Sequence, residues 1–378
     1  MSQLIILSVN NSWNILNFRM GLIRRMQGMG YAVAVVSPAD AHAERFADLG
    51  IVHIPAEIDS KGLSPIADLR LLKRYLSIFR KYRPVALLGW TIKPNIYGSI
   101  AAHILGIPVI NNVSGLGTVF IKRSPVTAIV STLYRLAFSR SATVFFQNPD
   151  DRHLFVEKRL ISERRSMLLP GSGIDTRKFA PPVPAIHRLD GAGSFTFLLV
   201  ARLLRDKGIG EYVQAARTVR ARFSTARFQI LGVADADNRT AISRQELSSW
   251  IEEGVISYLG AADDVRPHIG AADCIVLPSY REGMPRALLE GAALAKPLIA
   301  TRVPGCTEIA REGVNALLCT VRDPASLADA MVRMIELSDE QRDRMGSAGR
   351  QIAVAEFDEQ IVADRYMAAL NAALADAG

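Results

Sequence analysis

The fold is indicated by residues 4–37, which read LIILSVNNSWNILNFRMGLIRRMQGMGYAVAVVS. Two short apolar runs, Leu4–Val9 and Ala32–Ser37, flank an amphipathic stretch at Phe18–Met29. Apolar runs of this length separated by a helix-sized segment are typical of a βαβ unit, in which a crossover helix joins two parallel strands. The start of the chain therefore predicts a parallel sheet covered by helices.

The same alternation continues to about residue 180 and starts again near residue 197. In the first series we expect strands at Val85–Trp90, Pro108–Asn111 and Thr143–Gln147, and helices near Tyr97–Leu105 and Val126–Arg140. In the second we expect helices at Ile209–Phe223 and Arg286–Ala295 and strands at Phe197–Ala201, Phe228–Gly232, Ile256–Leu259, Cys274–Pro278, Leu298–Thr301 and Leu317–Cys319. Three helical stretches follow Pro324. The pattern predicts an α/β protein with two doubly wound, Rossmann-like sheets.

Length and the distribution of proline and glycine predict the domain borders. The 378 residues correspond to two or three domains at ~150 residues each. Residues 180–194 read APPVPAIHRLDGAGS, a composition typical of a linker. We expect an N-terminal domain at 1–180, a second domain at 181–357, and a last helix at 358–378 that crosses back onto the first domain. Two facing sheets would leave an interdomain cleft, with ligands beyond the carboxyl ends of the strands.

Composition excludes several classes of protein. With 49% apolar and 22% charged residues, the chain has the usage of an ordinary globular protein. Cys274, Cys306 and Cys319 lack metal-ligand spacing, so we expect neither disulfides nor a zinc site, which suits a reducing cytoplasm. The first residues lack the basic segment of a signal peptide, and no apolar run is long enough to span a membrane.

The charge is distributed unequally. Residues 1–180 hold 23 Lys and Arg against 11 Asp and Glu, whereas residues 181–378 hold 22 against 26. A basic N-terminal half suggests an anionic partner, either nucleic acid or a lipid surface. No nucleic-acid-binding pattern is present, so we expect no nucleic-acid partner.

One predicted helix fits a membrane surface. It spans Leu69–Arg83, with Leu69, Leu72, Leu76 and Phe79 on one face and Arg70, Arg74 and Lys81 on another. Such a helix can lie on anionic lipid, and the apolar residues of 119–138 beside Lys122 and Arg123 add to this hypothesis. The alternative is an ordinary sheet-packing helix with solvated cations.

The segment richest in candidate site residues is 277–290, LPSYREGMPRALLE, which follows a predicted strand and opens a predicted helix. Backbone N–H groups at a helix start attract an anion. Glu282 and Glu290 could each accept hydrogen bonds from sugar hydroxyls, or they could be a capping residue and a solvated helix residue. Arg202 and Lys207, within VARLLRDKG at 200–208, are predicted at the same edge. Two cations there can hold a diphosphate, since a charge pair at about 4 Å contributes up to roughly 4 kcal/mol before desolvation.

These motifs together resemble the retaining glycosyltransferases of family 4, which have the GT-B architecture of two Rossmann-like domains. The order and spacing of the motifs match from about residue 165 to 355. The matching residues are Gly173-Ile-Asp175 with Phe179, Ala201-Arg202 with Lys207-Gly208, Pro278-Ser279 with Glu282-Gly283, the Glu282–Glu290 pair, Pro304-Gly305 with Glu308, and Gly313-Val-Asn315.

The resemblance implies roles for these residues. Arg202 and Lys207 would bind the donor diphosphate, Glu290 the ribose hydroxyls, and Glu282 the transferred sugar near its anomeric carbon. The implied catalytic residues are Glu282, Arg202 and Lys207. The implied nucleotide-sugar site consists of Arg202, Lys207, Ile256, Glu282, Gly283, Met284, Pro285 and Glu290, with Gly283 and Met284 contributing backbone N–H groups and Ile256 beside the base.

The resemblance implies no cofactor and no metal. Asp235-Ala-Asp237 looks like a metal-binding motif, but it lies in a loop of the second domain and we assign it no metal role. The chain also departs from the family. Many members carry a histidine in the region that here reads PVINNVSGLG at 108–117, so no catalytic histidine is assigned, and His103 is interpreted as a packed helix residue. Cys306 and Ala316 stand where the family often has glycine.

Part of the first half resembles a subgroup that extends polyprenyl-diphosphate-linked sugars, as in O-antigen or N-linked glycan precursor assembly. The segments are Thr91–Asn95 and Ser114–Phe120. The acceptor-binding residues implied are Lys93, Asn95, Gly115, Leu116 and Gly117. Glycines there would let a bulky ligand approach the backbone, and Lys93 could meet a phosphate. The alternative is a plain turn with a solvated lysine.

We therefore expect an enzyme that moves a hexose or N-acetylhexosamine from a UDP-sugar to a lipid-linked saccharide with retention of configuration. It would work in the cytoplasm, peripherally attached to the inner face of the cytoplasmic membrane. Two alternatives are a UDP-N-acetylglucosamine 2-epimerase, which needs no acceptor, and a non-catalytic nucleotide-sugar sensor.

Overall fold

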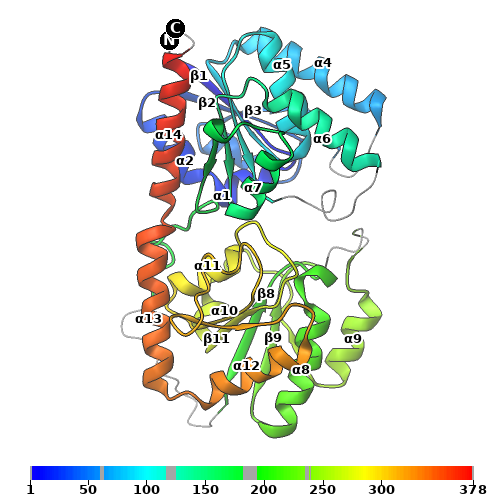
Figure 1. Cartoon of the computed structure of the whole chain (residues 1–378), viewed down its shortest axis with the longest axis vertical. Helices are drawn as coiled ribbons and strands as arrows, with labels where there is room; N and C mark the ends of the chain where they lie inside the picture. The colour runs from blue at the N-terminus through cyan, green and yellow to red at the C-terminus, as the bar shows by residue number, and fades with distance from the viewer. Residues whose placement is uncertain are drawn as a thin grey trace. The chain divides into compact units, whose positions relative to one another are not determined.

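The computed structural model describes residues 2–59, 64–115, 125–181, 194–234, 238 and 240–376. The chain forms two compact units (Figure 1). The first unit contains Met1–Gly173 and Glu359–Gly378, and the second contains Ile174–Asp358.

The first unit is built on a parallel sheet of seven strands in the order β3-β2-β1-β4-β5-β6-β7. Its strands are β1 (Leu4–Ser8), β2 (Ala32–Ser37), β3 (Val52–Pro55), β4 (Ala86–Trp90), β5 (Val109–Val113), β6 (Thr143–Phe146) and β7 (Ser166–Leu168). In the register of β1, Ile5 lies opposite Val33 of β2 and Ala86 of β4. The central strands are buried on both faces, which explains their almost continuous apolar sequences.

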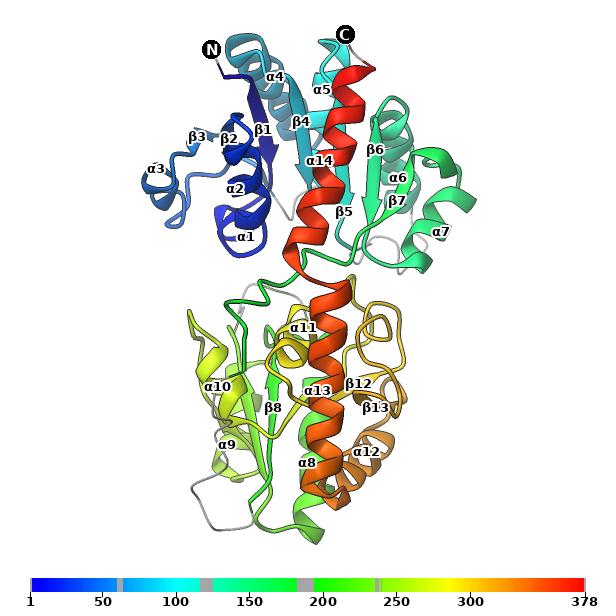
Figure 2. The same ribbon diagram turned by 90° about the vertical axis from the view of Figure 1, so that its left-hand side faces the viewer.

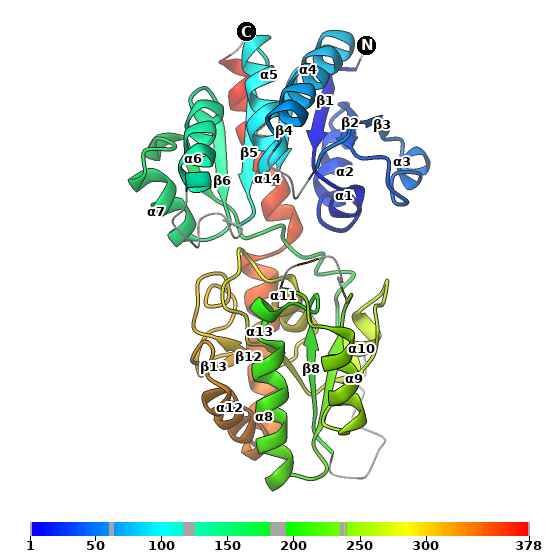
Figure 3. The same ribbon diagram turned by 90° about the vertical axis from the view of Figure 1, so that its right-hand side faces the viewer.

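Helices cover both faces of this sheet (Figures 2 and 3). One face packs against α1 (Ser12–Phe18), α2 (Met20–Gly28) and α14 (Glu359–Ala375), and the other against α4 (Pro65–Tyr82), α5 (Ser99–Ile104) and α6 (Pro125–Phe138). The alternation along β1 follows these layers, because Leu7 joins the α14 side while Ile6 joins the α4 side. The smaller elements are α3 (Arg45–Asp48), a π-helical turn at Pro94–Gly98, α7 (Pro149–Glu157) and a 3-10 turn at Glu163–Arg165.

The second unit has a parallel sheet of six strands in the order β10-β9-β8-β11-β12-β13. Its strands are β8 (Thr196–Val200), β9 (Arg227–Leu231), β10 (Ser257–Tyr258), β11 (Cys274–Leu277), β12 (Leu298–Thr301) and β13 (Ala316–Cys319). One face packs against α8 (Ile209–Arg222) and α12 (Pro324–Glu336), and the other against α11 (Arg286–Ala293) and α13 (Asp339–Glu356) (Figure 3). The helices α9 (Arg244–Glu252) and α10 (Arg266–Ala271) complete the unit.

The structure places the first border between the units earlier than the sequence predicted, at 173/174 instead of 180/181. Ile174 and Phe179 pack in the core of the second unit. Arg350 of α13 donates hydrogen bonds to the carbonyl oxygens of Thr176 and Phe179, at 2.8 and 2.9 Å. These contacts tie the segment after Gly173 to the second unit. Most of the predicted linker, residues 182–193, lies outside the described residues.

The helix considered for a membrane surface is α4, and its apolar stripe is used for packing. Leu71, Tyr75, Ile78 and Phe79 are buried against the sheet, whereas Leu69 is 53% exposed. The buried face of α4 is therefore rotated about the helix axis relative to the predicted apolar face. The helix packs against the sheet, as in the alternative interpretation of its sequence. Among the described residues, no helix has the length and apolar character needed to cross a bilayer.

Candidate active site

The candidate site lies where strand order reverses in the second sheet. The strand β8 pairs on one side with β9, which follows it in the sequence, and on the other side with β11. Ligands of doubly wound sheets bind outside the carboxyl ends of the strands at such a switch point. The two loops that leave these ends carry Lys207, after β8, and Glu282, after β11.

A short ion pair joins the two loops. Lys207 Nζ lies 2.6 Å from Glu282 Oε1, and the two side chains are only 16% and 13% exposed. Ser279 Oγ donates a second hydrogen bond to the same carboxylate oxygen at 2.7 Å. The carbonyl oxygen of Ser279 in turn accepts a hydrogen bond from Thr301 Oγ1 of β12. Glu282 is therefore fixed by residues from three strand ends, and the sequence motif alone did not predict the positioning roles of Ser279 and Thr301.

Glu290 lies one turn into α11, where its carboxylate is largely buried. Arg286 Nε donates to Glu290 Oε1 at 2.9 Å. Burial raises the pKa of Glu290 above its usual value, and the charges of Arg286 and Lys178 oppose this shift. A buried carboxylate near several cations is typical of a ligand-binding group rather than a solvated helix residue. The sequence predicted Glu290 but missed its partner Arg286.

Two glycines allow these loops to approach each other. Gly208 adopts the left-handed conformation at φ 72°, and an added Cβ would lie 2.1 Å from the Pro278 carbonyl oxygen. Gly305 has φ 87°, and an added Cβ would lie 2.5 Å from the Glu282 carbonyl oxygen. Any larger residue at either position would push apart the backbone segments that carry the site.

Replacing Gly208 by alanine is expected to lower the free energy of unfolding by roughly 3 kcal/mol, because the new methyl group adds left-handed strain to a backbone clash. Gly210 is a matched control: it lies within α8 and has open space around it. Gly210→Ala should raise stability by about 0.5 kcal/mol through helix propensity. Urea unfolding of both variants measures the difference. Equal stability of the two would contradict the close approach of the loops.

The predicted donor-contact residues differ in exposure. Ile256 is 4% exposed and belongs to the core beside α8, and its predicted position beside a base stays a prediction. Arg202 is exposed just after β8. Gly283, Met284 and Pro285 form the turn before α11, with Pro285 as its N-cap residue. Their predicted contacts with a donor stay predictions, and Asp235 and Asp237 lie outside the described residues.

The predicted acceptor residues differ in their burial and in their contacts. Lys93 Nζ lies 2.8 Å from Asp68 Oδ1, and both side chains are largely buried, so this lysine is not the solvated residue of the simple alternative. Asn95 is 1% exposed and donates to the Asn112 carbonyl oxygen at 2.8 Å. Its side chain is part of a buried hydrogen-bond network with Asn111 and Asn112, and its predicted acceptor contact stays a prediction. Gly115 has φ 146°, while Leu116 and Gly117 lie outside the described residues.

Other polar residues of the first unit also serve packing. His103 Nε2 lies 2.7 Å from the Ala137 carbonyl oxygen, and burial lowers the pKa of the imidazole.

In the second unit, Cys306 is fully buried and Ala316 lies within β13, so both of the family's glycine positions are filled without exposing the side chain. Cys274, Cys306 and Cys319 are buried free thiols.

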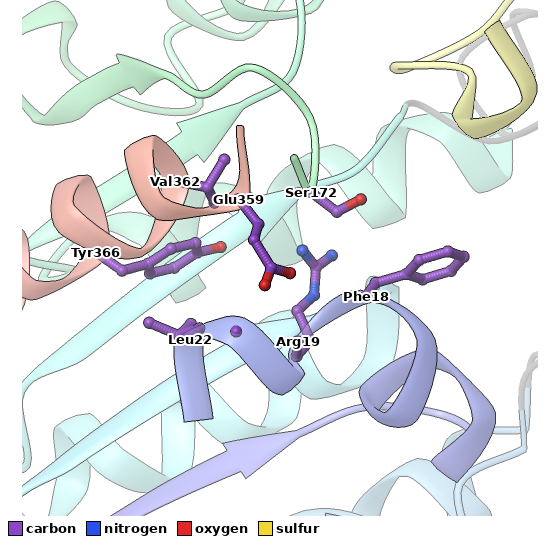
Figure 4. Close-up of a pocket in the computed structure, with 8 residues that line it drawn as sticks. Phe18, Arg19, Leu22, Ser172, Glu359, Val362 and Tyr366 are labelled. Carbon is purple, nitrogen blue, oxygen red and sulfur yellow. The ribbon is translucent and has the colours of Figure 1, made fainter. Parts of the chain in front are cut away.

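A small hollow in the first unit is lined by a buried arginine. Arg19 is 3% exposed, and its guanidinium carbon lies 4.9 Å from the ring centre of Trp90. Figure 4 shows the side chains of Arg19 and Glu359 pointing toward each other beside Tyr366. The hollow has a volume of about 10 Å³, enough for one water molecule but not for a sugar. It is therefore not a substrate site.

Two family models match the chain. Residues 5–148 match the model described as Glycosyl transferase 4-like, and residues 194–337 match the model described as Glycosyl transferases group 1. The second match includes Lys207, Glu282 and Glu290.

Relatives and solved structures agree with these matches. A Campylobacter jejuni protein named N,N'-diacetylbacillosaminyl-diphospho-undecaprenol alpha-1,3-N-acetylgalactosaminyltransferase is 26% identical over 366 residues, covering 94% of each chain. An Escherichia coli protein named UDP-Gal:alpha-D-GlcNAc-diphosphoundecaprenol alpha-1,3-galactosyltransferase is 25% identical over 287 residues, covering 73% of each chain. The crystal structure of Anabaena HepE with UDP and glucose has a TM-score of 0.81 and 17% identity, covering 98% of this chain and 100% of that one. This likeness confirms the predicted fold class.

Proposed function

We propose that this chain transfers a hexose or N-acetylhexosamine from a UDP-sugar to a polyprenyl-diphosphate-linked saccharide. The chain is a glycosyltransferase, because residues 5–148 match the glycosyl transferase 4-like family and residues 194–337 match the group 1 family. The transfer would retain the anomeric configuration and serve the assembly of a cell-surface polysaccharide or glycan precursor. The observation that carries the proposal is the largely buried Lys207–Glu282 pair at the switch point of the second sheet. The matched families favour transfer over the epimerase alternative.

Lys207 can serve two acceptors at once. Its ammonium group has three N–H donors, and Glu282 takes one of them. The remaining donors would bind the donor diphosphate together with Arg202, while Glu282 stays oriented by Ser279. In this arrangement the positive charge faces the departing diphosphate, and the carboxylate faces the developing positive charge of the sugar.

Retention would follow from a front-face reaction. The acceptor hydroxyl would attack the anomeric carbon from the side of the leaving group, and a diphosphate oxygen would take the hydroxyl proton as the bond from the anomeric carbon to the diphosphate breaks. Glu282 would stabilise the oxocarbenium-like centre between these steps. Arg202, Lys207 and the start of α11 would neutralise the leaving group without a metal ion.

The names of the relatives support the acceptor class. The Campylobacter and Escherichia coli proteins named above act, according to these names, on sugars linked to undecaprenol through a diphosphate. A similar acceptor would place this enzyme at the inner face of the cytoplasmic membrane. Lys93, in the first unit, is held by Asp68 and is the predicted contact for the acceptor phosphate.

A panel of nucleotide sugars tests the function, with release of nucleoside diphosphate as the measured quantity. We expect release from a UDP-sugar only when a short-chain polyprenyl-diphosphate saccharide is present, and an α-linked product by NMR. Epimerisation of the donor without acceptor would contradict the proposal. Binding of UDP with no turnover for any acceptor would indicate a sensor.

Glu290→Ala is expected to weaken UDP-sugar binding about 100-fold, because a charged partner of two ribose hydroxyls contributes roughly 1.5–3 kcal/mol. Isothermal titration calorimetry measures the loss. The wild-type protein should also lose affinity as pH falls, starting at a higher pH than for an ordinary glutamate, because only the ionised carboxylate accepts both hydroxyls and its pKa is raised.

Glu253→Ala is the matched control for this experiment. Glu253 is an exposed glutamate of the same unit, paired with Arg217 at 2.6 Å. Its loss should leave donor affinity and its pH dependence unchanged. Unchanged affinity in Glu290→Ala would remove the ribose assignment.

A further inference from the structure

A basic hollow lies on the first unit, between the end of α6 and the segment that joins α7 to β7. Its volume is about 490 Å³, within the range of ~300–1,000 Å³ that is typical of ligand sites. Among the described residues, no acidic residue lines the hollow. Four arginines line it: Arg135, Arg159, Arg164 and Arg165. The hollow therefore suits an anion.

Two of these arginines are held by backbone carbonyl groups. Arg135 donates to the carbonyl oxygens of Arg159 and Lys158, at 3.2 and 3.3 Å, and Arg165 donates to that of Ser139 at 2.6 Å. A guanidinium has five N–H donors, so each retains further donors beyond these bonds. The bonds fix the two cations beside the hollow, which lowers the entropy cost of binding an anion.

The other two arginines of the hollow are Arg159 and Arg164. Arg159 follows α7 with φ 53°, a left-handed position that normally favours glycine. Arginine there costs roughly 1–2 kcal/mol of backbone strain relative to glycine. Arg164 is exposed in the 3-10 turn. The neighbouring Glu163 is paired with Arg152 at 3.3 Å.

Exposed apolar side chains lie on α6, the helix whose end lines the hollow. Leu136 and Ile129 of α6 are 56% and 61% exposed, and their spacing of two helical turns places them on one face of the helix. Ile104 at the end of α5 is 60% exposed, and the preceding His103 contacts α6 through the Ala137 carbonyl oxygen. Branched apolar side chains beside arginines are typical of surfaces that lie in a membrane interface. A site for free phosphate would gain nothing from them.

We propose that this hollow binds the phosphate group of an anionic lipid, while Leu136 and Ile129 enter the interfacial layer of the membrane. The excess of basic residues in the first half of the sequence provides the long-range attraction. The proposal deepens the proposed function, on which it rests, by naming a surface of the first unit through which the enzyme would attach to the membrane. It also replaces α4 with α6 as the membrane-facing helix.

Flotation of the full chain with lipid vesicles tests this surface. The wild-type protein should bind vesicles of phosphatidylcholine with phosphatidylglycerol and bind pure phosphatidylcholine weakly. Arg159→Gly with Arg164→Gln should lower the partition coefficient about 10- to 30-fold, from the loss of two cations near the surface. Glycine suits the backbone at 159, so this variant should fold at least as well as the wild type.

A control variant removes the same charge elsewhere in the same unit. Arg24 and Arg45 are exposed on α2 and α3, and Arg24→Gln with Arg45→Gln should partition like the wild type. An equal loss in this control would show attraction by net charge alone and overturn the proposal. Wild-type partitioning of a Leu136→Ser, Ile129→Ser variant, with displacement of the protein by millimolar glycerol phosphate, would do the same, because the hollow would then be a site for soluble phosphate to which the apolar side chains add nothing.

The enzymatic readout separates this inference from the proposed function. With a water-soluble short-chain acceptor, the Arg159→Gly, Arg164→Gln variant should release UDP at the wild-type rate. Wild-type vesicle binding by this variant would overturn the lipid site while leaving transfer intact. Failure of the wild-type enzyme to turn over any lipid-linked acceptor would instead overturn the proposed function, whatever the vesicles show.

Discussion

Glu282→Gln is expected to lower kcat about 10²- to 10³-fold with little change in the KM for the donor. Glutamine has nearly the same shape and can keep the hydrogen bond from Ser279, so the variant removes the negative charge and little else. That charge would act mainly in the transition state, when the anomeric carbon becomes positive. Steady-state kinetics with saturating acceptor measure kcat and KM separately.

Glu211→Gln provides a control from the same neighbourhood. Glu211 of α8 accepts a hydrogen bond from Tyr280 of the Glu282 loop at 2.6 Å, but it is not assigned to the reaction. Its kcat should stay within about twofold of the wild type, since a neutral amide can keep a similar bond. Wild-type kcat in Glu282→Gln would exclude Glu282 as the group that stabilises the sugar.

Much of the fold was predictable because it depends on local patterns. Buried parallel strands such as β1 and β11 are continuous apolar runs, and their crossover helices have a clear period. The short edge strands β3 and β7 escaped prediction because their sequences lack a long apolar run. The border at Gly173 escaped prediction because composition indicates only a linker sequence, whereas the border depends on which core Ile174 and Phe179 join.

The site was predictable only in part, for a similar reason. Strand-to-helix turns bring Lys207 and Glu282 to one edge of the sheet, and the motif order indicated both residues. Their direct contact depends on the register between β8 and β11, which pairs Cys274 with Phe197 and which the sequence does not display. The burial of Ile256 is not visible in the motif either: the residue lies near a strand end, and its side chain packs in the core.

Replacing both Arg202 and Lys207 by alanine is expected to lower kcat/KM about 10³-fold or more, because both cations would neutralise the diphosphate in the transition state. The affinity for UDP should fall as well, since the diphosphate is charged before and after transfer. The variant should also melt at a lower temperature than the wild type, because Glu282 loses its partner in a largely buried position. Thermal unfolding shows whether it remains folded at the assay temperature.

The matched control removes two cations from α8, in the same unit. Arg217 and Arg222 form exposed pairs with Glu253 and Glu336, and their double alanine variant should keep the wild-type kcat/KM. This comparison separates local diphosphate binding from the general field of a basic protein, which would affect both variants alike. If the Arg202, Lys207 variant keeps wild-type rates, the diphosphate binds elsewhere. The Lys207–Glu282 pair would then be a structural link between the ends of β8 and β11.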